Sequence, residues 1–130
     1  MTVDCERLTS AWLRSRTSIT SIVADRVYTA TPENPTFPLM RINQYGGSPV
    51  FSKPLYLDRA AMQFDCYGGA KVLARQLADA ARTELAAMVG SHSLGVVTSV
   101  EFGEMRYLPD DSYAPAKPRW IVEAVVYSHP

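Results

Sequence analysis

The most restrictive feature of this sequence is an alternating strand that leads, through two glycines, into an amphipathic helix. Apolar Ala60, Met62, Phe64 and Cys66 alternate with Arg59, Ala61, Gln63 and Asp65 between residues 57 and 67. This period of two predicts a β-strand in a sheet that is covered on one face only. Gly68 and Gly69 end the strand, and residues 70–89 predict a helix with one apolar stripe and with Gly90 as its C-terminal cap.

The remaining patterns complete one small domain. Residues 2–16 predict a helix of about three turns and residues 19–23 a short helical turn. Three prolines at positions 32, 35 and 38 predict an extended loop over residues 26–38. Alternation or β-rich composition predicts further strands at residues 39–45, 96–108 and 119–127. We therefore expect a single α+β domain over residues 1–130, with a small, mainly antiparallel sheet and helices packed on one face.

Composition and charge argue against several classes of protein. Thirteen basic residues balance thirteen acidic ones, whereas a protein that grips nucleic acid usually has a basic excess. Cys5 and Cys66 form no CxxC pair, and the alternation predicts that Cys66 is buried in a reducing compartment. No signal peptide and no apolar run of about 20 residues is evident. These features predict a cytosolic protein without a membrane segment.

No motif for catalysis, a cofactor or a metal is assembled in the sequence. His92 and His129 have no second ligand at helical spacing and are expected in contact with solvent. Ser91 and Ser93 flank His92 too closely to form a catalytic triad with it. The Gly68-Gly69 turn lacks the remainder of a phosphate-binding loop. We predict that the protein is not an enzyme and needs no cofactor or metal.

One carboxylate interrupts the apolar stripe of the long helix. Glu84 lies near the middle of the stripe, where an unpaired charge would be costly. It is expected either to reach water or an arginine such as Arg26 or Arg41, or to face a neighbouring subunit.

Two irregular segments are the strongest candidates for a contact surface. Residues 45–56, which look like an exposed hairpin or arm, and residues 109–118 combine Pro or Gly with aromatic residues and isolated charges. The second segment is acidic at its start and basic at its end, which permits complementary pairing between neighbouring subunits. Such composition is typical of contact surfaces, although ordinary mobile loops can share it. Subunit or tube contacts are assigned by hypothesis to Tyr45, Phe51, Lys53, Glu84, Asp110, Asp111, Tyr113 and Lys117.

The order of elements resembles a known family. The resemblance rests on Asp25-Arg26-Val27-Tyr28 with the prolines that follow, on Gln63-Phe64-Asp65-Cys66-Tyr67, and on the closing strand at residues 119–127. These features are similar to those of the tail-terminator, or tail-completion, proteins of long-tailed bacteriophages. The resemblance covers nearly the whole chain.

This resemblance implies a structural protein of the virion. Such proteins form a hexameric ring on the tail tube protein, stop tube polymerisation and provide the docking surface for the head, where a head-completion or connector protein binds. Assembly would occur in the host cytoplasm and the ring would lie at the head-proximal end of the tail. DNA would pass through the lumen without specific binding. Two alternatives remain open: a head–tail adaptor or head-closure ring, and a small ligand-binding domain or enzyme that uses Arg59, Gln63 and Asp65 on the open sheet face.

Overall fold

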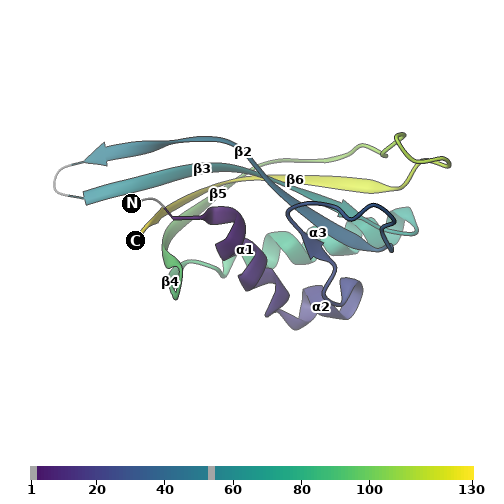
Figure 1. Ribbon diagram of the computed structural model, residues 1–130, viewed down its shortest axis with the longest axis horizontal. Helices are drawn as coiled ribbons and strands as arrows, with labels where there is room; N and C mark the ends of the chain where they lie inside the picture. Colours follow the sequence, from purple (N-terminus) through teal and green to yellow (C-terminus); the bar gives the residue numbers. More distant parts are fainter. Residues whose placement is uncertain (1–2, 53–54) are drawn as a thin grey trace.

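A six-stranded sheet with three helices forms the part of the chain that this computed structural model describes, residues 3–52 and 55–130 (Figure 1). The elements in order are α1 (Cys5–Arg14), α2 (Thr17–Val23), β1 (Val27–Tyr28), β2 (Leu39–Ser52), β3 (Leu55–Tyr67), α3 (Lys71–Ala86), β4 (Gly90–His92), β5 (Gly95–Tyr107) and β6 (Arg119–His129). The strand order across the sheet is β1-β2-β3-β6-β5-β4. The α+β fold class is therefore confirmed.

The sheet is mixed. Strand β1 pairs with β2 in parallel, and the other neighbouring pairs are antiparallel. Strand β1 was missed by the sequence, which placed Val27 and Tyr28 in a proline-rich loop. It consists of two residues opposite Met40 and Arg41, too few to produce a periodic signal.

Figure 1 draws the three helices below the sheet, and buried residues of the helices and of β3 belong to one hydrophobic core. Four predicted inward residues of β3, Ala60, Met62, Phe64 and Cys66, are at most 2% exposed. Asp4 caps the N-terminus of helix α1, because its side chain accepts a hydrogen bond from the Arg7 N–H. The indole of Trp12 donates a 2.7 Å hydrogen bond to the Glu84 carbonyl oxygen and so joins α1 to α3.

The end of α3 differs from the prediction. The helix ends at Ala86 with Ala87 as its cap, and Gly90 instead begins β4 with a φ of 138°. His92 was expected in a solvated loop but lies in β4, half-buried. Its ring meets the Trp12 ring edge-on at 5.3 Å, and its Nε2 lies 2.6 Å from the Met88 carbonyl oxygen.

The second face of the sheet is more buried than its polar sequence predicts. Asp65 is 3% exposed and Ala61 7%, although both alternate with the core residues of β3. In the strand register, Asp65 lies between Arg41 of β2 and Ile121 of β6. Gln63 of the same strand donates a 2.8 Å hydrogen bond to the buried Asp65 carboxylate.

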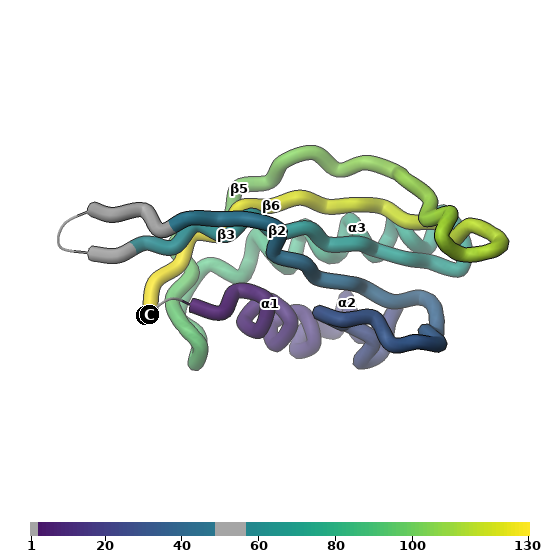
Figure 2. Tube along the Cα trace, turned by 45° about the horizontal axis from the view of Figure 1, so that its top comes forward, coloured from purple at the N-terminus to yellow at the C-terminus, as the bar shows by residue number. Residues whose placement is uncertain are grey.

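The domain has two distinct ends. Asp58 is the first residue of β3 that pairs with β6. Residues 55–57 of β3 therefore pair with β2 alone. This two-stranded extension lies at the end of the sheet that also carries the C-terminus (Figure 1). The loop between β5 and β6 lies at the opposite end (Figure 2).

Candidate functional site

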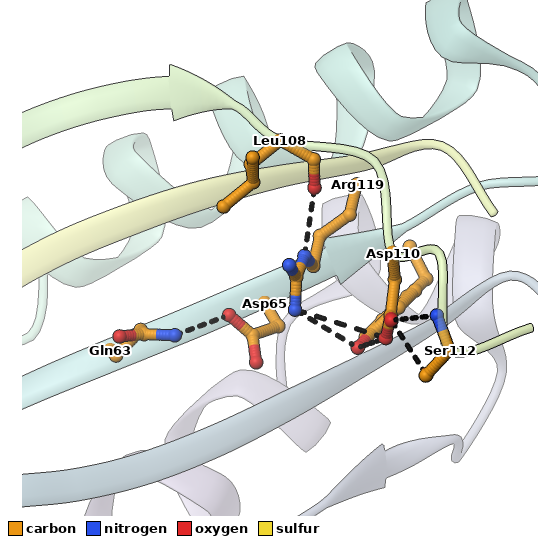
Figure 3. A network of polar contacts seen from close by, with 7 residues as sticks. Gln63, Asp65, Leu108, Asp110, Ser112 and Arg119 are labelled. Carbon is orange, nitrogen blue, oxygen red and sulfur yellow. Dashed lines mark hydrogen bonds and ion pairs between the residues drawn. The ribbon is translucent and has the colours of Figure 1, made fainter. Parts of the chain in front are cut away.

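The loop at residues 109–118 is held to the sheet by one carboxylate (Figure 3). Asp110 accepts hydrogen bonds from the Ser112 N–H at 3.0 Å and hydroxyl at 2.6 Å, and from the Tyr67 hydroxyl at 2.7 Å. Arg119 lies 3.8 Å from the same carboxylate and donates a 2.9 Å hydrogen bond to the Leu108 carbonyl oxygen. The Asp110 side chain is 15% exposed. It therefore acts as the internal anchor of this loop.

The environment of Asp110 favours its ionised form. Burial by itself would raise its pKa, but the hydrogen bonds from Ser112 and Tyr67 and the charge of Arg119 outweigh burial and hold the pKa below its ordinary value. Burial and the hydrogen bond to Asp110 raise the pKa of the Tyr67 phenol. The pair therefore keeps a donor hydroxyl opposite a charged acceptor at neutral pH.

Aromatic rings close the same loop over the end of the sheet. Tyr113 meets Phe37 edge-on at 5.3 Å, and Phe37 lies 5.6 Å from Tyr67. Lys117 places its ammonium 4.9 Å above the Phe37 ring. The Asp110 and Lys117 backbones pair as an antiparallel bridge, with hydrogen bonds of 2.9 and 3.0 Å. Three of the predicted contact residues in this loop thus have partners inside the chain.

Asp111 is the exception in this loop. Its side chain is exposed, and no ion pair in the described part of the chain includes it. The assignment of this loop to contacts between proteins stays a prediction, and Asp111 is its most accessible acid. A charge-reversal test of that prediction should leave Asp110 unchanged, because Asp110 holds the loop itself.

The predicted arm is a continuation of two strands. Strands β2 and β3 pair from Leu39 opposite Tyr67 to Ser52 opposite Leu55, interrupted by a bulge between Gln44 and Gly46. Tyr45 is the extra residue of this bulge, and it is 56% exposed. The sequence had predicted two shorter strands with an exposed hairpin or arm between them, whereas the strands themselves continue to Ser52 and Leu55. Glycine and proline obscured the alternation there.

Of the two other predicted arm residues, one is described only in its backbone and the other is not described. The Phe51 backbone pairs with Tyr56, and its side chain lies outside the described part of the structure. Lys53 lies outside the described residues altogether. The base of the arm requires glycine at position 47, whose φ is 143° and where a Cβ would lie 2.2 Å from the Arg59 carbonyl oxygen.

Glu84 has partners within the chain. Its carboxylate accepts hydrogen bonds from Arg16 Nε at 2.9 Å and from the Ser18 hydroxyl at 2.5 Å, and its side chain is 12% exposed. The hydrogen bond from Ser18 and the charge and hydrogen bond of Arg16 lower its pKa. An arginine partner was expected, but the choice of Arg26 or Arg41 was wrong. Arg26 instead donates to the Pro38 carbonyl oxygen at 2.8 Å.

The described residues contain no group of three or more His, Cys, Asp or Glu side chains placed to hold a metal ion. Both cysteines are buried, and burial raises the pKa of each thiol, which disfavours a reactive thiolate. No helix in the described part of the chain is both long and apolar enough to cross a membrane.

Comparisons with known proteins agree with the fold. A family model described as "Tail completion protein gp17" matches residues 9–121. A chain in the solved structure "Virion of native gene transfer agent (GTA) particle" superposes with a TM-score of 0.67 at 14% sequence identity. That match covers 95% of this chain and 94% of the other. The search of curated proteins found no match.

Proposed function

This chain belongs to the tail completion protein gp17 family of bacteriophage virion proteins, and from that premise we propose that it caps the tail tube as a ring. The ring ends polymerisation of the tube protein and provides the surface on which the head docks. The observation that carries the proposal is the family match over residues 9–121. The shared fold with a chain of a gene transfer agent virion supports it.

The shape of the domain suits a joining role. A protein that connects a tube to a head needs two separate contact surfaces, and this domain has two different ends. One carries the extension of β2 and β3, and the other carries the anchored loop between β5 and β6. We assign the extension to the tube or to a neighbouring subunit, because its sequence Val50-Phe51 and Leu55-Tyr56-Leu57 is apolar.

The sheet edges support a ring with head-to-tail contacts. Strand β1 covers β2 only at Met40 and Arg41, and β4 covers β5 only between Gly95 and Val97. In the described residues, the outer edges of β2 and β5 are therefore mostly without a strand partner. Two unlike edges on opposite sides of a domain suit the heterologous interface of a cyclic oligomer. We propose a hexamer.

Electron microscopy of tail tubes mixed with the purified protein tests the proposal. We expect a ring at one end of each tube, and tube protein added afterwards should not lengthen that end. Mass photometry of the released ring should give six copies of the 14.4 kDa chain. A ring that binds isolated heads but ignores tubes would instead identify a head–tail adaptor or head-closure protein. A monomer that binds neither would contradict the proposal.

A further inference from the structure

A polar cleft lies at the edge of the sheet, between α1 and the end of β1. It has a volume of about 400 Å³, and the residues that line it include Asp4, Arg7, Ser10, Arg14 and Tyr28. Residues 7, 10 and 14 are separated by three and four positions, so their side chains share one face of α1. The cleft therefore gathers arginine and hydroxyl donors from a helix and from the adjoining strand.

The acids of this cleft already have partners, whereas its donors do not. The Asp4 carboxylate accepts a hydrogen bond from the Arg7 N–H at 3.1 Å, and the Glu6 carboxylate accepts one from the Gln44 N–H at 2.8 Å. Among the hydrogen bonds and ion pairs of the described residues, none involves the Arg7 guanidinium or the Ser10 hydroxyl. Donors of this kind fit a carboxylate, which an arginine binds through charge-assisted hydrogen bonds.

An exposed carboxylate lies on the other side of the sheet, in β5 (Figure 2). The register of β5 with β6 is interrupted between Phe102 and Met105, and Glu104 belongs to this bulge. The Glu104 side chain is 71% exposed. Arg106 lies 3.8 Å from Glu104 but 3.3 Å from Glu123, so the arginine keeps a partner when Glu104 turns away. Glu104 is therefore available to a group outside its own domain.

The bulge and the cleft lie at the same level along the strands. The bulge is opposite Glu123 of β6, whose register partner in β3 is Gln63. Gln63 in turn pairs with Asn43 of β2, and Tyr28 of the cleft pairs with β2 only two residues away, at Arg41. Copies placed side by side can therefore bring the bulge of one to the cleft of the next without sliding along their strands. Such a contact can repeat and close into a ring.

We propose that Glu104 of one copy binds in the cleft of the next copy, with Arg7 as its principal partner. This contact rests on the ring proposed above and identifies the two surfaces that meet in it. A second copy of this chain is the fitting occupant, because each chain carries both the cleft and the exposed acid, on opposite sides of its sheet. Both side chains are exposed in the single chain, so the contact should weaken as salt is added.

Charge reversal on each side, and then on both, tests the contact. R7E and E104R each bring like charges together, so each should raise the protein concentration at which rings form by at least about tenfold. The matched control R7E/E104R carries both changes and restores opposite charges at every interface, so it should form rings near the original concentration. An equimolar mixture of R7E and E104R should also form rings, in which the two variants alternate. Sedimentation velocity and electron microscopy of tube ends measure ring formation, and melting curves check that each variant is folded.

The outcomes separate this contact from the proposed capping function. Rings formed by R7E and by E104R at the original concentration would overturn the contact and leave capping intact. The contact is also wrong if neither R7E/E104R nor the mixture recovers rings. Normal rings of R7E that no longer bind tubes would assign the cleft to the tube protein instead of a second copy. Rings that depend on charge in the expected way but leave tube ends uncapped would support the contact and contradict the capping function.

Discussion

The loop at residues 109–118 and the segment at residues 45–56 have similar compositions but different structures. Both contain proline, an aromatic residue and isolated charges. The loop is bound to the domain by Asp110, by its bridge to Lys117 and by the packing of Tyr113. In the other segment, the residue pairs from Val50 opposite Leu57 outward lie beyond β6 and form the two-stranded extension. The first segment is tied to the body of the fold, and the second extends beyond the neighbouring strand β6.

The difference depends on which distant residues each segment meets. Tyr67 and Arg119, at the ends of β3 and β6, provide the polar partners that the loop needs. The outermost residues of the extension pair only with each other, and a two-stranded ribbon is marginally stable alone in water. Composition therefore identified two unusual segments but did not show which one the domain itself requires.

Replacement of Asp110 by alanine should have the largest effect on folding. The variant loses the acceptor of Ser112 and Tyr67 and leaves Arg119 partly buried without its partner. Hydrogen bonds to a charged group contribute about 1.5–3 kcal/mol each, with incomplete additivity, so we expect a loss of about 2–3 kcal/mol. Urea unfolding at pH 7 measures it.

The neighbouring Asp111 provides the control. Its exposed side chain has no ion-pair partner in the described structure, so D111A should change the unfolding free energy by less than about 0.5 kcal/mol. Equal effects of D110A and D111A would show that the loop is not anchored through Asp110. The contrast between loop and extension would then be lost.

Acid should reduce the advantage of the original chain over D110A. The pKa of Asp110 is lowered in the folded state, so its contribution is complete above the unfolded value near 3.8 and is lost as the pH falls through the folded value. Glu84 also has a lowered pKa, but both proteins contain it, and its effect cancels in the difference. Unfolding at pH 7 and at pH 3 should show a smaller difference at pH 3. A constant difference would contradict an ionised anchor.

The sequence predicted those elements whose hydrophobic pattern repeats several times along one continuous segment. The alternation from Ala60 to Cys66 and the apolar stripe of α3 each extend over several repeats, and the structure buries both. Strands β1 and β4 contain two and three residues, so no periodicity could reveal them. They form because longer strands next to them offer free edges.

The candidate site was harder to predict because its contacts join distant parts of the chain. Opposite charges at Asp110 and Lys117 suggested pairing between neighbouring subunits, whereas their backbones form a bridge within the loop. Glu84 was recognised as a misplaced charge, but its partner Arg16 follows α1, and only packing of α1 against α3 brings them together. Sequence patterns identify unusual residues, and tertiary structure determines their partners.

Replacement of Phe51 by serine in the extension should have the smallest effect on folding. The same variant should have the largest effect on assembly. The backbone of residue 51 pairs only with β3, at a position beyond the last pairing with β6. If this tip contacts the tube or a neighbouring subunit, F51S should change the unfolding free energy by less than about 0.5 kcal/mol and yet abolish the cap in electron micrographs.

The matched variant Tyr113→Ser should behave in the opposite way. Its ring packs edge-on against Phe37 and lies 6.4 Å from Tyr67, so Y113S should cost about 1–2 kcal/mol. It should still cap tubes at temperatures where it remains folded, if the loop contributes mainly to the fold. Loss of capping in a folded Y113S would extend the contact surface to the loop, and an unstable F51S would show that the extension also supports the domain. Each variant therefore separates a fold role from an assembly role.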